Sequence, residues 1–236
     1  MKFISHSLFY MDKEQIQSAL AKAKDISEKR NFRQSYDLII NLKGLDLKKQ
    51  EHQIDAFVTL PHSRGKKVKV CALVGPELEQ HAKGIFDFTI MSDDFQKYKD
   101  KKDIKKVANN FDFFIAQANI MPKVATAFGR VFGPRGKMPN PKSGSIVAPN
   151  ANLKPLYEKL QKTVRAINKT APLIQCPVGT EDMDIKDVAE NALTVYSSLL
   201  QVLPNEKHNI KDIYIKLTMG KPVKVGEKLE VEKEVK

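Results

Sequence analysis

The sequence of 236 residues has no long apolar run, and its best apolar stretches, such as Val70 to Gly75, have only the length of a β-strand. A helix that crosses a membrane needs roughly 18 consecutive apolar residues, so a protein with membrane-spanning helices is excluded. Near the N-terminus, His6 and Ser7 interrupt the apolar residues that a secretory signal would need. With 42% hydrophobic residues, the chain is expected to be a globular protein of one large or two smaller domains that binds no membrane.

Cysteine is scarce as well. The two cysteines, Cys71 and Cys176, lie far apart in the sequence. Each stands in a stretch of valine, leucine and isoleucine that predicts a strand, so both are interpreted as reduced core residues. This usage suits the reducing cytoplasm.

The motifs of several enzyme classes are missing. The five histidines are scattered, without an HExxH pattern or a nearby cysteine pair, so no metal site is predicted. The stretch around Gly136 fails as a nucleotide phosphate loop, because Val131 and Met138 occupy the positions of a required glycine and a required serine or threonine. The patterns GxGxxG and GxSxG are also absent. We therefore expect neither an enzyme nor a cofactor; the alternative, an enzyme that binds a nucleotide, would need the phosphate loop that the sequence lacks.

Acidic residues are absent from the whole stretch between Phe113 and Tyr157. The chain as a whole has 40 Lys and Arg against 28 Asp and Glu, a net charge of +12. Cations without acidic neighbours indicate an external anion, which favours a polyanion partner over a merely solubilising surface. Inside the stretch, Gly129 to Ser145 is rich in glycine and proline and predicts a long exposed loop that contacts anions. The cations of the acid-free stretch are Lys123, Arg130, Arg135, Lys137, Lys142 and Lys154.

Two other charged clusters need no ligand. The lysine-rich run from Lys97 to Lys106 contains acidic residues at helical spacing and predicts a solvated helix face. The acidic residues Glu181, Asp182, Asp184 and Asp187 offer carboxylates for a metal. Their place at the start of a predicted helix explains them more simply through capping and the helix dipole, with Asp184 as the N-cap.

Both ends of the sequence mix helical and strand periodicity. Asp12 and Gln15 stand where a capping box would begin a helix. The predicted helices are Lys13–Arg30, Leu153–Lys162 and Ile185–Leu203, and the predicted strands are Ser35–Leu42, Gln53–Leu60, Ala171–Val178 and Ile210–Thr218. The charge-mixed tail from Val223 is expected to follow the ordered part.

The pattern changes after the turn-rich, basic segment Pro61 to Lys66, which is interpreted as a linker. Beyond this segment, nearly continuous apolar strands alternate with helical stretches. Such alternation predicts a small α/β unit whose sheet is parallel and covered.

Two short segments beside strands are candidates for nucleic-acid contact. Phe32 lies between Arg30 and Arg33, which suits stacking of the ring on a base with guanidinium groups near phosphates; packing in the core is an equal alternative. Thr218 to Gly220, followed by Lys221, offers a hydroxyl, a bare backbone and a cation, although a plain turn at a strand end explains the segment equally simply.

Longer segments resemble one family. IMPKVATAFGRVFGPRGKMPNP (Ile120 to Pro141) and TMGKPVKV (Thr218 to Val225) resemble the hallmarks of large-subunit ribosomal protein L-one, the protein of the mobile side stalk. RNFRQSYDLIINLKGLD, VTLPHSRGK and APLIQCPVGTEDM agree in the same order, and the forms NLKGLD and VGTEDM resemble archaeal members.

The resemblance implies two domains: an α+β domain from Met1 to Lys66 plus Pro155 to Lys236, and an inserted Rossmann-like α/β domain from Lys67 to Lys154. It also implies a cytoplasmic protein that is a monomer within the ribosome. Such a protein binds side-stalk rRNA of the large subunit, helps to release exit-site tRNA and represses translation of its own mRNA.

Residue roles follow by position in the motifs. Five residues are similar to the family's RNA-contacting residues, and Arg30 joins them beside Phe32. Lys43 would neutralise phosphate, Phe32 would pack on ribose or base, Thr218 would bond a 2′-hydroxyl, and Gly220 would allow close approach of the backbone. The implied RNA-contacting residues are Phe32, Lys43, Thr218, Met219 and Gly220. From the acid-free stretch, Arg130, Arg135, Lys137 and Lys142 are expected as secondary RNA contacts. Gln34 and Ser35 depart from the Glu and Thr of many members.

Overall fold

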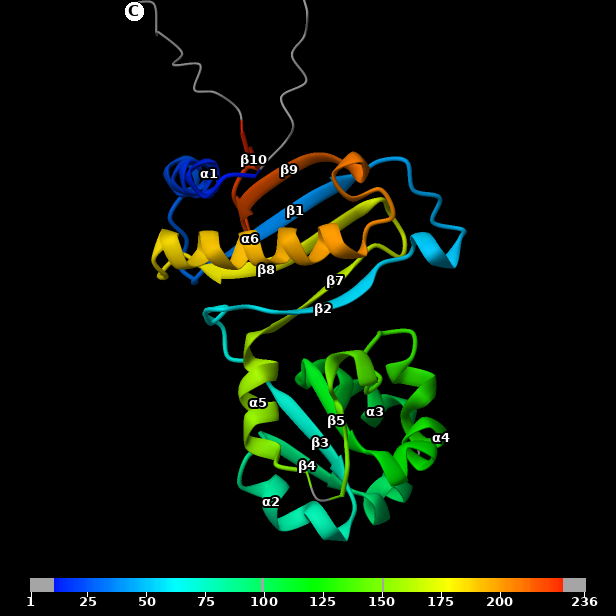
Figure 1. The fold of residues 1–236 in the computed structure, drawn as a ribbon. Coiled ribbons are helices and arrows are strands. Elements are labelled where there is room, and N and C mark those ends of the chain that lie inside the picture. The colour runs from blue at the N-terminus through cyan, green and yellow to red at the C-terminus, as the bar shows by residue number, and fades with distance from the viewer. Residues whose placement is uncertain (1–10, 99, 150, 227–236) are drawn as a thin grey trace, which may run out of the picture. The chain divides into compact units, whose positions relative to one another are not determined.

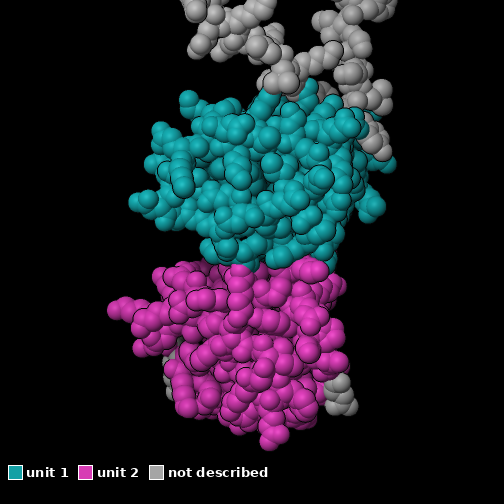
Figure 2. All heavy atoms as spheres, turned by 90° about the vertical axis from the view of Figure 1, so that its left-hand side faces the viewer, with its two compact units in different colours: residues 1–66, 164–236 teal, residues 67–163 magenta. Residues whose placement is uncertain are grey.

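The computed structural model describes residues 11–98, 100–149 and 151–226, and the chain forms two compact units (Figure 2). Unit 1 comprises Met1–Lys66 and Val164–Lys236, and unit 2 comprises Lys67–Thr163. The first boundary falls after Lys66, at the end of the segment interpreted as a linker.

Unit 1 is built on a four-stranded antiparallel sheet in the order β10-β9-β1-β8 (Figure 1). Its strands are β1 (Ser35–Leu42), β8 (Leu173–Thr180), β9 (Ile210–Leu217) and β10 (Val223–Lys224). Ser35 pairs with Thr180, and Tyr36 pairs with Leu217. The start of β1 therefore lies between the ends of β8 and β9.

Two helices, α1 (Lys13–Ile26) and α6 (Ile185–Val202), share a core cluster with this sheet. Every second residue of β1 is buried, because side chains alternate between the faces of a strand. Asp184 begins α6 as predicted, since its carboxylate accepts a hydrogen bond from the Lys186 amide at 3.0 Å. The side chain of Asp12 makes no capping bond to α1, so the predicted capping box is wrong.

A two-stranded sheet pairs β2 (Asp55–Thr59) with β7 (Thr163–Ile167). The Arg165 guanidinium donates from Nε and Nη2 to the two carboxylate oxygens of Asp55, at 2.7 and 2.6 Å.

The short 3-10 helices are η1 (Gln50–His52), η2 (Pro76–Leu78), η3 (Ser92–Lys97), η4 (Ala118–Ile120), η5 (Pro141–Ser143) and η6 (Glu206–Asn209).

Unit 2 has a wholly parallel sheet in the order β4-β3-β5-β6. Its elements are β3 (Val70–Val74), α2 (Glu79–Lys83), β4 (Phe88–Met91), α3 (Lys101–Asn110), β5 (Phe113–Gln117), α4 (Met121–Phe132), β6 (Ile146–Val147) and α5 (Leu153–Lys162). Phe114 packs with α3 and α4, whereas its neighbour Ile115 packs with α2 and α5, so both faces of the sheet are covered. The α/β part and the α+β part of the predicted fold class are confirmed.

The second boundary between the units lies later than predicted. Leu153 and Leu160 of α5 belong to the core cluster of Val68 and Val70. The Gln161 amide accepts a hydrogen bond from the Val68 N–H at 2.9 Å and donates one to the Val68 carbonyl at 2.7 Å. The helix α5 is therefore part of unit 2, and the division before Pro155 is wrong.

Both cysteines are buried and free, Cys71 in β3 and Cys176 in β8. Burial raises the pKa of both thiols, that of Cys176 to about 12. Their prediction as core residues is confirmed.

The tail prediction is wrong in part, because Val223 and Lys224 pair with Ile215 and Tyr214 of β9. The remaining tail residues, 227–236, and the first ten residues, with His6 and Ser7, lie outside the described residues. Across residues 11–98, 100–149 and 151–226, no helix is long and apolar enough to cross a membrane.

Candidate nucleic-acid interface

The end of the unit 1 sheet joins two segments that are far apart in the sequence. The Thr218 amide donates to the Ser35 carbonyl at 3.1 Å. The Thr218 hydroxyl accepts from the Ser35 amide at 3.1 Å and lies 3.3 Å from the Ser35 carbonyl. The predicted contact residues at positions 32 and 218–220 therefore gather where β1 begins and β9 ends.

Gln34 fixes the turn after β9. Only 2% of its surface is exposed, and its side-chain oxygen accepts a hydrogen bond from the Met219 amide at 3.1 Å. Its own backbone amide donates to the Glu181 carboxylate at 3.0 Å. Gln34, one of the two residues that depart from the family pattern, is thus buried and holds the turn beside the candidate contacts.

Gly220 packs closely against the residue that follows α1. A Cβ atom at this position would lie 2.2 Å from the hydroxyl oxygen of Ser27, the residue after α1. The Gly220 amide also donates to the Leu217 carbonyl at 2.9 Å, which closes the turn. The bare backbone that was assigned to RNA contact also lets the turn approach the end of α1.

A basic hollow of about 510 Å³ opens at this end of the sheet. It is lined by Phe32, Arg33, Ser35, Asp37, Arg64, Lys66, Pro177, Thr180 and Thr218. Three cations face one acidic residue there, and burial raises the pKa of that acid, Asp37. Arg64 and Lys66 were not predicted as contacts; the signal for them was the basic segment PHSRGK, which was interpreted only as a linker.

Phe32 and Met219 are exposed although both are apolar. Their exposed fractions are 51% and 62%, so the alternative that Phe32 packs in the core is wrong. Arg30 lies nearby in sequence and pairs with Glu28 at 2.9 Å, with both side chains in solvent. Exposed ion pairs of this kind are weak, so Arg30 can exchange its partner for a phosphate.

Lys43 lies at the opposite end of β1 from Ser35. A strand rises by about 3.3 Å per residue, so the eight residues of β1 separate the two ends by roughly 25 Å. The structure does not bring Lys43 together with the other predicted contacts, and only a long ligand could touch both ends.

Two cations of the acid-free stretch have internal partners. The Lys137 ammonium donates to the carbonyls of Ala108 and Phe111, at 2.7 and 2.6 Å, and so caps the end of α3. Burial lowers its pKa. The Arg135 guanidinium donates to the side-chain oxygen of Asn109. The ammonium of Lys137 is therefore held by internal partners, so the inference that every one of these cations needs an external anion is wrong for Lys137. Arg135 is exposed like Arg130 and Lys142, and its hydrogen-bond partners, a backbone carbonyl and an amide side chain, are neutral.

The predicted long loop from Gly129 to Ser145 is wrong in part, because its longest stretch without helix or strand is residues 133–140. Its first four residues end α4, and Pro141–Ser143 form η5, in which the Asn140 side chain accepts from the Lys142 amide at 2.9 Å. Glycine at position 144 is suited to its φ of +73°, which other residues rarely adopt.

We expect Lys137→Met to lower the free energy of unfolding of unit 2 by about 1–3 kcal/mol, because two carbonyls lose a charged donor. Methionine keeps the apolar stem of the side chain. Urea unfolding monitored by circular dichroism measures the change, with Lys142→Met as the matched control of an exposed lysine. Equal stability of the two variants would contradict the capping role.

The other charged clusters behave as solvated surface. Lys106 pairs with Asp103 at 3.0 Å within α3, and Lys97 pairs with Asp94 at 2.6 Å in η3, before that helix begins. Among the residues that the structure describes, no group of three metal-binding side chains was found.

A buried side chain occupies the edge of the unit 2 sheet where parallel sheets usually bind a nucleotide. In such folds, ligands bind beyond the carboxyl ends of the strands where the strand order reverses, here between β3 and β5. Gln117 fills this place: it is fully buried, accepts from the Gly75 amide and donates to Glu77, both at 2.9 Å. This packing disfavours the alternative of a nucleotide-dependent enzyme.

Comparison with known proteins distinguishes the two predicted functions, a ribosomal protein and a nucleotide-binding enzyme. Residues 20–221 match the model of the ribosomal protein L1p/L10e family. The large ribosomal subunit protein uL1 of Nanoarchaeum equitans is 43% identical over 208 residues, which cover 86% of this chain and 96% of that protein. The uL1 proteins of Methanothermobacter thermautotrophicus and Methanocaldococcus jannaschii are 41% and 38% identical, and the matches cover 90% and 91% of this chain and 99% and 96% of those proteins.

These relatives are ribosomal proteins and not enzymes, which confirms the predicted class and the archaeal resemblance. The match of the family model covers most of the chain, and it includes the whole of the first hallmark segment and Thr218–Lys221 of the second. The chain belongs to the ribosomal protein L1p/L10e family, as a structural constituent of the large ribosomal subunit.

Proposed function

We propose that the chain binds the side-stalk rRNA of the large subunit through the basic hollow of unit 1. The observation that carries this proposal is the meeting of an exposed Phe32, the turn at Thr218 and three cations at one end of the sheet. Arginine and lysine neutralise phosphates, an exposed ring stacks on a base, and backbone groups with a hydroxyl can bond a ribose 2′-hydroxyl.

Arg33, one of the cations of the hollow, can reach an external phosphate at a small cost in free energy. Arg33 donates to Asp182 at 3.4 Å and to the Gly65 carbonyl at 2.9 Å, and about half of its side chain is exposed. An exposed pair at such a distance contributes little, so phosphate can replace Asp182.

Unit 2 takes a secondary part in the proposed function. Arg130 and Lys142 are exposed and are proposed to meet RNA phosphates in the assembled ribosome. Release of exit-site tRNA and repression of the chain's own mRNA are proposed as well, on the support of the resemblance in the hallmark segments.

Binding to a transcribed side-stalk fragment of the Methanothermobacter thermautotrophicus large-subunit rRNA tests the main proposal. With three phosphate contacts, the slope of log affinity against log salt concentration should be about −2 to −3. The fragment should bind at least about tenfold more tightly than an unrelated hairpin of equal length at the same salt. Equal affinity for both RNAs would contradict the proposal.

A further inference from the structure

The segment Pro61–Lys66 carries two of the three cations of the basic hollow, Arg64 and Lys66. It is also one of the two parts of unit 1 that join unit 2 directly in the sequence. A turn-rich segment on the surface holds a side chain in place only where its backbone is fastened to the rest of the unit. The contacts of this segment therefore decide where the two cations lie.

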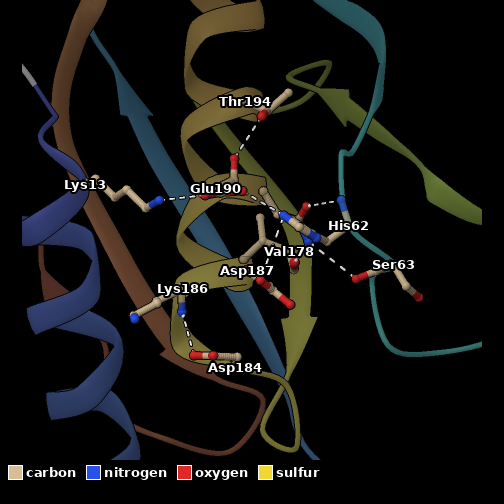
Figure 3. A network of polar contacts seen from close by, with 10 residues as sticks. Lys13, His62, Ser63, Val178, Asp184, Lys186, Asp187, Glu190 and Thr194 are labelled. Carbon is tan, nitrogen blue, oxygen red and sulfur yellow. Dashed lines mark hydrogen bonds and ion pairs between the residues drawn. The ribbon is translucent and has the colours of Figure 1, made fainter.

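One end of the segment is fastened to α6 (Figure 3). The backbone amide of His62 donates to the Asn191 side-chain oxygen at 3.0 Å, and the His62 ring nitrogen Nε2 lies 2.7 Å from a Glu190 carboxylate oxygen. Asn191 is fully buried and donates to the Val178 carbonyl at 2.8 Å, so it is itself held rigidly.

The Glu190 carboxylate also bonds to α1. Lys13 of α1 donates to the second oxygen of Glu190 at 2.6 Å. The hydrogen bonds from Lys13 and His62 lower the pKa of Glu190 to about 2, so its carboxylate is charged throughout the physiological range. Asp187 adds a further carboxylate oxygen 3.9 Å from the His62 ring.

The other end of the segment lies directly against the hollow. Gly65 has a φ of +80°, and a Cβ atom there would lie 2.2 Å from the hydroxyl oxygen of Thr180, which lines the hollow. The Gly65 carbonyl accepts from Arg33, the third cation of the hollow. The backbone between Arg64 and Lys66 is thus seated on the wall of the hollow.

We propose that His62 is a positioning residue of the RNA site, which together with Glu190 and Asn191 holds the segment 61–66 so that Arg64 and Lys66 face the bound RNA. The inference rests on the proposed function, because it assigns a task in RNA binding to residues that do not touch the RNA.

A double-mutant cycle on the full chain tests the proposal with the side-stalk fragment as the probe. We expect His62→Ala to weaken binding about 5- to 10-fold in the wild-type background, and less than about 2-fold once Arg64 and Lys66 are already alanine. His62→Gln retains a donor for Glu190 and should restore most of the affinity. The slope of log affinity against log salt concentration should become less steep by up to about 2 units in the Arg64→Ala/Lys66→Ala variant.

The matched control removes two positive charges from another part of unit 1. Lys48→Ala/Lys49→Ala takes two exposed lysines from the opposite end of the sheet and should change affinity and salt slope far less. An equal loss from His62→Ala in both backgrounds, or equal losses from the two double variants, would overturn the proposal.

Hydrogen exchange of the free protein separates this inference from the proposed function. The peptide covering residues 61–66 should exchange faster in His62→Ala than in the wild type, with other peptides unchanged. Absence of binding by the wild-type chain would contradict RNA binding itself and the task of His62 in it. If hydrogen exchange in residues 61–66 were the same in His62→Ala as in the wild type, the positioning role would be wrong, even if the variant bound the RNA more weakly.

Discussion

Replacing Phe32 with alanine is expected to weaken binding of the side-stalk fragment by about 1–3 kcal/mol, or roughly 5- to 150-fold, because stacking of a base on an aromatic ring contributes that much. The ring is 51% exposed in the free protein, so little buried surface is lost on its removal. The melting temperature should therefore stay within about 2 °C of the wild type. Filter binding and differential scanning calorimetry measure the two quantities.

The matched control for Phe32→Ala is Phe88→Ala. Phe88 has a similar exposed fraction of 42% but lies in β4 of unit 2, stacked on Phe111 at 5.6 Å between ring centroids. Its removal should leave the affinity for the RNA fragment unchanged and lower the stability of unit 2 instead. If Phe32→Ala bound as tightly as the wild type, the exposed ring would have no part in recognition.

Unit 1 should fold and bind the RNA fragment without unit 2. We expect a chain in which residues 67–163 are replaced by a short Gly/Ser linker to retain affinity within about 10-fold of the full chain, because the basic hollow is lined by unit 1 residues alone. Unit 1 has its own core cluster, formed by its sheets with α1 and α6. The linker can be short, because Gln161 bonds the Val68 backbone where the two connections enter unit 2.

The reciprocal fragment, residues 67–163, provides the contrast. It lacks the hollow and should bind at least about 100-fold more weakly than the full chain, in the range of non-specific electrostatic attraction. Circular dichroism and thermal melting establish that each fragment is folded before binding is measured. An unfolded unit 1, or binding concentrated in the unit 2 fragment, would show that the division of function between the units is wrong.

The sequence by itself determined the local elements and the family. The strand Ser35–Leu42 and the helix Leu153–Lys162 have the predicted bounds, and Asp184 caps α6 as predicted. Periodicity and capping depend on neighbours within a few residues, which any sequence displays. The hallmark segments are contiguous in the same way, so the order of their residues was enough to indicate the family.

Only the tertiary structure decided which of these residues meet. Ser35 and Thr218 are far apart in the sequence, yet the pairing of β1 with β9 brings them together, so that the Ser35 amide donates to the Thr218 hydroxyl at 3.1 Å. Lys137 lacks acidic neighbours in sequence, but α3 brings two backbone carbonyls to its ammonium. Arg64 and Lys66 became candidates only when β8 and the start of β1 closed a hollow beside them. Charge and composition are local quantities, whereas the partner of a charge is set by chain segments that packing brings together from a distance.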